Sequence, residues 1–285
     1  MVIDIHTHTF PDKIAARTIE NLSRKSRTVA FTDGTINSLS ASMKKSGVDV
    51  SVVLPVATRP DQVEKINDFA ARTNENFFER GIFSFGCIHP DFTNFKTELN
   101  KIKNLGLKGI KIHPVYQDTD LDDKKFLRIF YRAAELDLIV LTHAGLDIGF
   151  PGVIRCSPEM SRRVVETIGD FKFVLAHMGG WKNWDAVKKI LAGTKIYLDT
   201  AFSFGKIIPR PDCVWEPAEL EMLNEKNFLD LCKTFGFDKI IFGTDSPWSS
   251  QKNSVEFIKN LPIPEEDAKK ILGENALNLF GGKIL

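Results

Sequence analysis

Short, almost purely apolar runs recur along the chain and predict its strands. There are eight such runs, and most are continuous in valine, isoleucine, leucine and phenylalanine rather than alternating with polar residues. Continuous runs of this length are typical of parallel strands that are buried on both faces. The runs cover residues 2–5, 48–54, 82–88, 107–112, 138–142, 171–176, 195–198 and 239–242.

Amphipathic stretches between these runs predict helices, among them residues 61–78, 95–104, 123–135, 158–168 and 184–191. Asp61 and Asp123 are suited to cap a first turn, and Pro158 is suited to a first helical position. Glycines stand where several helices should end before the next strand. These glycines are Gly47, Gly81, Gly106 and Gly236.

The alternation of strand and helix predicts an α/β fold, a closed (β/α)8 TIM barrel. The strand ends from His8 to Asp245 span seven repeats of about 34 residues, the length of one β-α unit. A doubly wound sheet would need a glycine-rich first turn, which residues 9–12 lack. We expect one domain over residues 1–285, with 268–280 as its closing helix. Insertions at 9–36 and 201–225 should lie at the C-terminal face, where barrel enzymes bind substrates.

The composition limits the kinds of molecule that this protein is expected to bind. With 38 basic and 37 acidic residues, a net charge of +1 provides no field to hold nucleic acid or an anionic membrane. No run approaches the roughly 18 apolar residues of a membrane span, and the first residues lack the features of a secretory signal. The four cysteines are widely spaced, as expected for reduced thiols. We therefore expect a cytoplasmic protein with no nucleic-acid or membrane partner.

Histidines end five of the predicted strands. His6 and His8 end the first, and side chains two apart on a strand point to the same side. Alone, this pair fits a metal site or two hydrogen-bonded imidazoles equally well. Four more histidines end other strands, and Asp245 ends the eighth. Imidazole and carboxylate suit zinc and similar ions, and three histidines with one carboxylate leave a position open for a catalytic water. The four histidines that end the other predicted strands are His89, His113, His143 and His177.

Five motifs occur in order at strand ends: IDIHTH at 3–8, GIKIHP at 109–114, THAG at 142–145, AHMGG at 176–180 and FGTDSP at 242–247. With ILGENA at 271–276, they resemble the amidohydrolase superfamily over the whole chain. The resemblance is closest to its amidohydrolase-2 branch, which includes aminocarboxymuconate semialdehyde decarboxylase-like enzymes and assorted hydrolases. It implies that His6, His8, His143 and Asp245 hold one divalent metal, zinc first and manganese as the alternative. It also implies that His177 lies beside the metal-bound water as an acid, base or electrostatic clamp.

Three further strand-end residues allow more than one role. Lys111 lies two residues before His113 on the predicted strand, so both side chains should point to the same side, the barrel interior. Binuclear members of the superfamily carry a carboxylated lysine at the end of the fourth strand, but Lys111 lies two residues short of that end. We expect a buried, charge-paired lysine and a single metal. His113 fits either a substrate contact or a support for the metal ligands, whereas His89 is expected to be a packed residue.

The ligand set fits two reactions. In a hydrolase, a divalent ion lowers the pKa of bound water from 15.7 to about 7, and Asp245 and His177 move protons as the water attacks a carbonyl. In a decarboxylase of a small carboxylic acid, with aromatic acids as one option, the same site protonates or hydrates the substrate carbon before carbon dioxide leaves. We place the hydrolase first. A non-catalytic metal-binding barrel is a remote alternative, and the neutral charge argues against a nuclease that also begins with His-x-His.

Several aromatic and arginine side chains are candidates for contacting a small-molecule substrate. The aromatic residues could stack a planar substrate or pack against loops, and the arginines could clamp a carboxylate or remain solvated. The oligomeric state is left open, with a homodimer as one option. The candidates are Trp181, Trp248, Phe202, Phe204, Arg59, Arg155 and Arg210.

Overall fold

A computed structural model describes residues 1–284, and it contains a strand in each of the eight predicted apolar runs. The run at 82–88 holds two short strands, β3 and β4, that flank Phe85. The hairpin β7–β8 is the one sheet element in the described chain that the pattern of apolar runs does not predict. The strands are β1 (Ile3–Thr7), β2 (Val50–Val53), β3 (Ile82–Ser84), β4 (Gly86–Cys87), β5 (Gly109–Ile112), β6 (Ile139–Thr142), β7 (Leu146–Asp147), β8 (Phe150–Ile154), β9 (Phe173–Leu175), β10 (Tyr197–Asp199) and β11 (Ile240–Ile241).

The parallel strands follow one another around a ring. Their hydrogen-bonded order is β1-β2-β3 in one sheet and β11-β10-β9-β6-β5-β4 in the other. The first and last strands are connected by an isolated parallel bridge between Thr7 and Ser246 and by a 3.0 Å hydrogen bond from Ile5 N to Phe242 O. The predicted TIM barrel is therefore confirmed.

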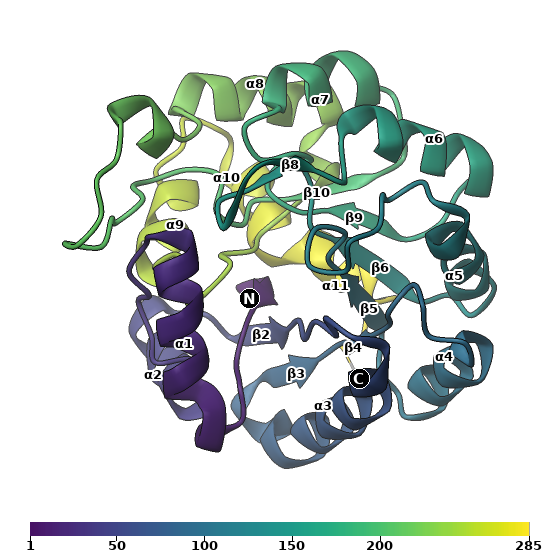
Figure 1. The fold of residues 1–285 in the computed structure, drawn as a ribbon. Helices are drawn as coiled ribbons and strands as arrows, with labels where there is room; N and C mark the ends of the chain where they lie inside the picture. The colour runs from purple at the N-terminus through teal and green to yellow at the C-terminus, as the bar shows by residue number, and fades with distance from the viewer. Residues whose placement is uncertain (285) are drawn as a thin grey trace.

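Helices surround the strands as an outer layer (Figure 1). They are α1 (Asp12–Ser26), α2 (Ile36–Ser46), α3 (Val63–Phe77), α4 (Phe95–Asn104), α5 (Lys124–Glu135), α6 (Pro158–Ile168), α7 (Trp184–Leu191), α8 (Glu225–Phe235), α9 (Gln251–Lys259), α10 (Glu265–Lys269) and α11 (Asn275–Leu279). A π-helical turn at Lys270–Glu274 joins the last two into the predicted closing helix. No helix within residues 1–284 is long and apolar enough to cross a membrane.

The core has two layers, which follow from the two faces of each strand. Outward-facing residues such as Ile110 and Ile112 pack with the helices in one cluster. Inward-facing residues such as Ile5 and Leu141 form a second cluster inside the barrel, together with Leu279 of α11. The inner cluster fills one end of the barrel, so the other end is left for polar side chains.

Most predicted helix ends agree with the structure, but one cap is wrong. The Asp123 carboxylate accepts a hydrogen bond from Lys125 N, and Gly47 ends α2 with a φ of 67°. Asp61, in contrast, lies inside a 3-10 turn at Pro60–Gln62 that precedes α3. Its carboxylate accepts from Arg59 Nε at 2.9 Å instead of capping backbone N–H groups. The proline at position 60 starts the turn earlier than the apolar pattern indicates.

Three segments extend the barrel at the C-terminal ends of the strands. The insertion at 9–36 contains α1, and the insertion at 201–225 contains a 3-10 turn at Pro217–Leu220. An isolated bridge between Thr28 and Pro209 joins these two insertions. The hairpin of β7 and β8 follows β6. Together they build the walls around the polar end of the barrel.

Candidate metal centre

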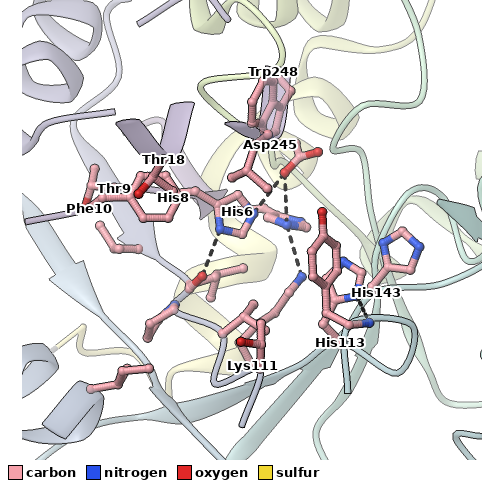
Figure 2. Close-up of a pocket in the computed structure, with 18 of the residues that line it drawn as sticks. His6, His8, Thr9, Phe10, Thr18, Lys111, His113, His143, Asp245 and Trp248 are labelled. Atoms are coloured by element: carbon pink, nitrogen blue, oxygen red, sulfur yellow. Dashed lines mark hydrogen bonds and ion pairs between the residues drawn. The ribbon is translucent and has the colours of Figure 1, made fainter. Parts of the chain in front are cut away.

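The predicted histidine pair meets the predicted aspartate where the first and last strands end. His6 and His8 leave β1 on the same side, and Asp245 follows β11. Oδ1 of Asp245 lies 3.0 Å from Nε2 of His8 and 3.4 Å from Nε2 of His6 (Figure 2). These three atoms form a group compact enough to hold a metal ion.

Hydrogen bonds fix the tautomers of His6 and His8. Nδ1 of His6 donates to Asp199 Oδ2 at 2.7 Å, and Nδ1 of His8 donates to the carbonyl oxygen of Leu54 at 2.8 Å. Each Nε2 atom therefore keeps its lone pair and directs it at the Asp245 carboxylate. A histidine that ligates a metal usually donates its other N–H to a carboxylate or a carbonyl in this way.

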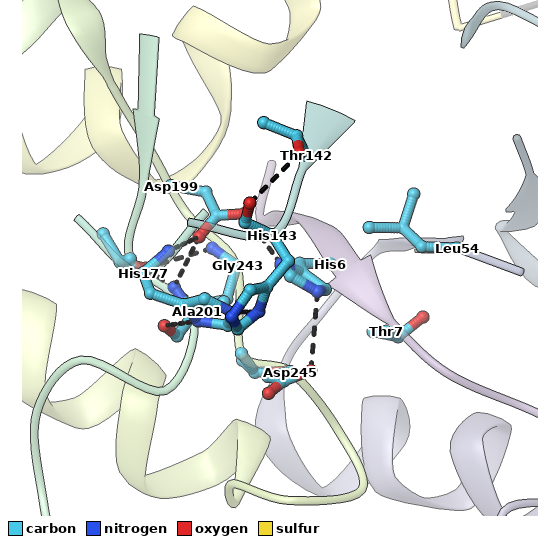
Figure 3. Close-up of polar contacts among 12 residues, drawn as sticks. His6, Thr7, Leu54, Thr142, His143, His177, Asp199, Ala201, Gly243 and Asp245 are labelled. Atoms are coloured by element: carbon cyan, nitrogen blue, oxygen red, sulfur yellow. Dashed lines mark hydrogen bonds and ion pairs between the residues drawn. The ribbon is translucent and has the colours of Figure 1, made fainter. Parts of the chain in front are cut away.

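His143 and His177 show the same arrangement. Nε2 of His143 donates to Leu146 O at 3.1 Å, and Nδ1 of His177 donates to Ala201 O at 2.8 Å. The free nitrogens, His143 Nδ1 and His177 Nε2, face each other at 3.0 Å (Figure 3). Two lone pairs at this distance repel unless a proton or a cation neutralises them.

Burial keeps these rings in the form that binds metals. It lowers the pKa of His6, His143 and His177 below the ordinary value, because a charged imidazolium would lose its solvation. Burial also acts to raise the pKa of Asp245, but its interactions with His8, His177 and Lys111 outweigh burial and lower that pKa. Neutral imidazoles beside an ionised carboxylate are the donor set of a zinc- or manganese-type ion. The residues present therefore fit a divalent metal.

His143, predicted as a fourth ligand, lies in a second group of candidate donors. This group contains His113, His143 and Asp147, all buried. The rings of His113 and His143 stack at a centroid distance of 4.3 Å. Nε2 of His113 lies 3.4 Å from Asp147 Oδ2. Nδ1 of His143 thus faces His177, whereas its Nε2 faces Asp147 of the second group.

Lys111 lies between the two groups and has a different partner from the one expected. The side chain is buried, as its parity predicts, and its Nζ lies 3.1 Å from Nε2 of His6. Burial lowers its pKa to about 8, although the charges of Asp199 and Asp245 oppose that shift. Within residues 1–284 no carboxylate oxygen lies close enough to form an ion pair with it, so its direct partner is an imidazole.

The predicted substrate-contacting residues divide into those that line the pocket and those that do not. A cavity of about 700 Å³ opens over the centre, and its lining includes His113, Trp181, Phe202, Trp248 and Arg59. Arg59 is nonetheless paired with Asp61. The other three, Phe204, Arg155 and Arg210, do not line the cavity.

Two of the predicted arginines are held by acidic neighbours away from the cavity lining. Arg155 pairs with Asp118 and Asp120. Arg210 pairs with Glu20 and Asp212 and ties the two insertions together. Their guanidinium groups are therefore engaged in ion pairs outside the pocket.

Two predicted residues belong to the packing of the barrel. Phe204 stacks on Phe257 at a centroid distance of 3.9 Å inside the outer core. His89, expected to be packed, is buried, and its Nδ1 accepts a hydrogen bond from Asp91 N at 3.1 Å. Neither residue lines the cavity.

Sequence reasoning missed three residues at the site. Asp199 orients His6 and also accepts hydrogen bonds from the backbone N–H groups of His177 and Ala201. It ends β10, so the strand-end rule that identified Asp245 would have found it. Asp147 ends β7 of the hairpin and Tyr116 lies in the turn after β5, and the pattern of apolar runs predicts neither position.

Comparisons with known proteins agree with the fold. Residues 3–282 match the family model described as Amidohydrolase. An uncharacterized TIM-barrel protein from Bordetella bronchiseptica has a TM-score of 0.75 at 16% identity over 99% of each chain. 5-Carboxyvanillate decarboxylase from Sphingomonas paucimobilis has a TM-score of 0.63 at 16% identity over 98% of each chain.

A third solved structure is a dihydroxybenzoic acid decarboxylase from Polaromonas sp. JS666 with bound manganese and 2-nitroresorcinol. It has a TM-score of 0.67 at 16% identity, over 98% of this chain and 96% of that one. At these identities the likeness shows a shared fold. No curated protein matches the chain in sequence.

Proposed function

This chain belongs to the amidohydrolase family, whose model matches residues 3–282, and on that premise we propose that it is a metal-dependent decarboxylase of a small carboxylic acid. The proposal reverses the order of the two reactions expected from the sequence. It is supported by decarboxylases of aromatic acids among the similar solved structures, two of which are described above.

One observation carries the proposal. Five groups with potential metal-binding atoms, His6, His8, His143, His177 and Asp245, line one cavity, and each of the four imidazoles donates its N–H to an oxygen outside the group. In the proposed site, His6, His8, His143 and Asp245 hold one divalent ion, zinc or manganese. When bound, that ion supplies a Lewis acid that neutralises the negative charge of the substrate.

The remaining chemistry is a proton transfer by residues of this chain. Decarboxylation breaks the bond between the carboxylate and the adjacent carbon, and the bonding electron pair stays with that carbon. The same carbon takes up one proton, and carbon dioxide leaves. His177 and Asp245 both line the cavity, and we assign to them the holding and delivery of this proton.

Carbon dioxide release by the metal-loaded protein tests this function. Reconstitution with Zn²⁺ or Mn²⁺ should yield about one ion per chain, and a panel of carboxylated aromatic acids should include one that releases carbon dioxide. Elemental analysis that finds no bound metal after reconstitution with either ion would refute the proposal.

Hydrolysis is the second candidate, and the lowered pKa of Asp245 favours it. An ionised carboxylate can accept a proton from an attacking water, which is the role a hydrolase requires. Lactones and amides assayed alongside the acids separate the two reactions. Turnover of a lactone or amide without carbon dioxide release would establish the hydrolase.

A further inference from the structure

We infer that the cavity has a second arm, between α1 and α3, that holds an elongated apolar body of the substrate. This inference rests on the proposed function, because it assumes that the acidic head of the substrate faces the metal centre. The structure assigns the substrate class: an acid whose carboxyl group is joined to more apolar surface than one aromatic ring presents.

The first wall of the arm is a face of α1 that is left partly exposed to the cavity. Ile14, Thr18 and Leu22 are spaced four residues apart, so they lie on one face of the helix, and all three line the cavity. The buried residues of α1 are Ala15 and two serines, and Ile14 is 50% exposed. Amphipathic helices normally bury such a face against a core.

The second wall is the facing surface of α3. Ile66, Phe69, Ala70 and Thr73 recur at helical spacing and line the same cavity. Residues 53–56, at the end of β2 and directly after it, line the same cavity. The arm therefore has apolar side chains on opposite walls, although neither wall belongs to the metal centre.

The arm is continuous with the metal centre at His8. Figure 2 shows Phe10 and Thr18 on one side of His8, and His113 and His143 on the other. The exposed side chains of Lys65 and Arg72 also line the cavity, so the arm reaches the protein surface. A ligand with its acidic group near Asp245 can thus extend past His8 between the helices.

The size of the cavity excludes a single-ring acid as a complete fit. A volume of about 700 Å³ corresponds to more than twenty waters at about 30 Å³ each, and it lies in the range of sites for drug-sized ligands. A benzoate at the metal centre would leave the arm filled with water against apolar side chains. An apolar body that displaces this water gains affinity in proportion to the area it covers.

Binding of matched acids to the metal-loaded protein tests the arm. The probes are benzoate against 4-phenylbenzoate and butanoate against decanoate, measured by titration calorimetry on the Mn²⁺-loaded full chain. We expect the longer acid of at least one pair to bind at least about tenfold more tightly than the shorter. Equal affinities within both pairs would overturn the inference.

Variants on one helix show where the longer acid binds. Thr18→Trp fills the arm, so the preference for the longer acid should fall to about one while benzoate affinity and metal content stay unchanged. Ala16→Trp, on the exposed side of α1, is the matched control and should keep the preference. Leu22→Ser is a second, less bulky variant, and it should weaken the preference for the longer acid. Retention of the full preference in folded Thr18→Trp and in Leu22→Ser would also overturn the inference.

The same titrations distinguish this inference from the proposed function. Benzoate that binds equally well with and without Mn²⁺ would contradict the metal-dependent function. A missing preference for length contradicts only the arm.

Discussion

At the scale of single residues, the centre is defined by where each imidazole keeps its proton. His6, His8, His143 and His177 each donate their N–H to an oxygen that lies outside the group. The backbone carbonyls that accept three of these protons are fixed by the strands and the loops that follow them. The acceptor of His6, the Asp199 carboxylate, is a side chain, and it is therefore the one that a substitution can change.

Asp199→Asn should weaken metal binding by about 10- to 100-fold, the usual effect of losing a partner of a ligating histidine. Oδ1 of the asparagine can still accept from the backbone of His177, but its amide NH₂ would face the N–H of His6. His6 must then change tautomer and lose the lone pair on Nε2. Competition with a chelating dye measures the affinity. Asp170→Asn, at the exposed end of an ion pair, is the control. Unchanged affinity would contradict the orienting role of Asp199.

Asp245→Asn should lower kcat at least about 100-fold on any substrate that the native protein turns over. The amide keeps the size of the side chain but loses the charge that attracts a metal and the basicity that moves a proton. Circular dichroism should show a folded barrel. An active and folded variant would refute the role assigned to Asp245.

Three of the four cysteines should be unreactive in the native protein. Burial raises the pKa of Cys87, Cys156 and Cys232, with that of Cys156 reaching about 12, so at pH 8 these thiols carry almost no thiolate. Cys213 is partly exposed. Titration with Ellman's reagent at pH 8 should modify one thiol per native chain and four after unfolding. Fast modification of more than one native thiol would contradict this burial.

At the scale of elements, the loops after β6 and β9 are locked together behind the histidines. Gly145 pairs with Trp181 in an isolated bridge, and the N–H of Trp181 donates to Ala144 O at 2.9 Å. His143 precedes this contact on one loop and His177 on the other. The 3.0 Å approach of their rings therefore depends on how closely the two loops pack.

Gly145→Ala should destabilise the protein by at least about 2 kcal/mol and weaken metal binding. Gly145 has a φ of 86°, and an added Cβ would lie 2.2 Å from the backbone nitrogen of Trp181. Gly152→Ala is the matched control: its φ is 80°, but nothing lies within 4 Å of its added Cβ, so it should cost only about 1–2 kcal/mol of backbone strain. Chemical denaturation compares the two. Equal losses of unfolding free energy in the two variants would mean that the close packing of the loops does not contribute to stability.

The sequence predicts elements wherever burial leaves a pattern, and it fails where burial is partial. The eight barrel strands are buried on both faces, so their runs are apolar throughout. The hairpin strand β8 is mostly exposed and carries no such pattern. The position of Asp147 beside His113 follows from that hairpin and was equally invisible. His143 and His177 could be placed at strand ends, but their mutual approach depends on a φ of 61° at His177 that no periodicity encodes.

At the scale of the whole molecule, a metal ion should stabilise the entire fold. Its proposed ligands come from the first, fifth and eighth barrel strands, so binding ties distant parts of the chain together. At a metal concentration 100 times Kd, the gain is about 2.7 kcal/mol. For a chain of this length, that corresponds to a rise in Tm of about 5 °C. Differential scanning fluorimetry with Zn²⁺, Mn²⁺ or EDTA measures it, with Asp245→Asn as the control. An unchanged Tm at saturating metal would contradict the binding of a metal ion by these ligands.

The contact between the ends of the first and last strands also has a consequence for biosynthesis. Asp245 N donates to His6 O at 2.7 Å, so the seam that closes the ring is also the place where His6 and His8 meet the carboxylate. A nascent chain that has emerged only as far as α8 holds both histidines but lacks Asp245. It cannot assemble the site, however well its earlier strands have formed. If the proposed ligands hold the metal, its capture would be a late event in maturation that requires a complete barrel.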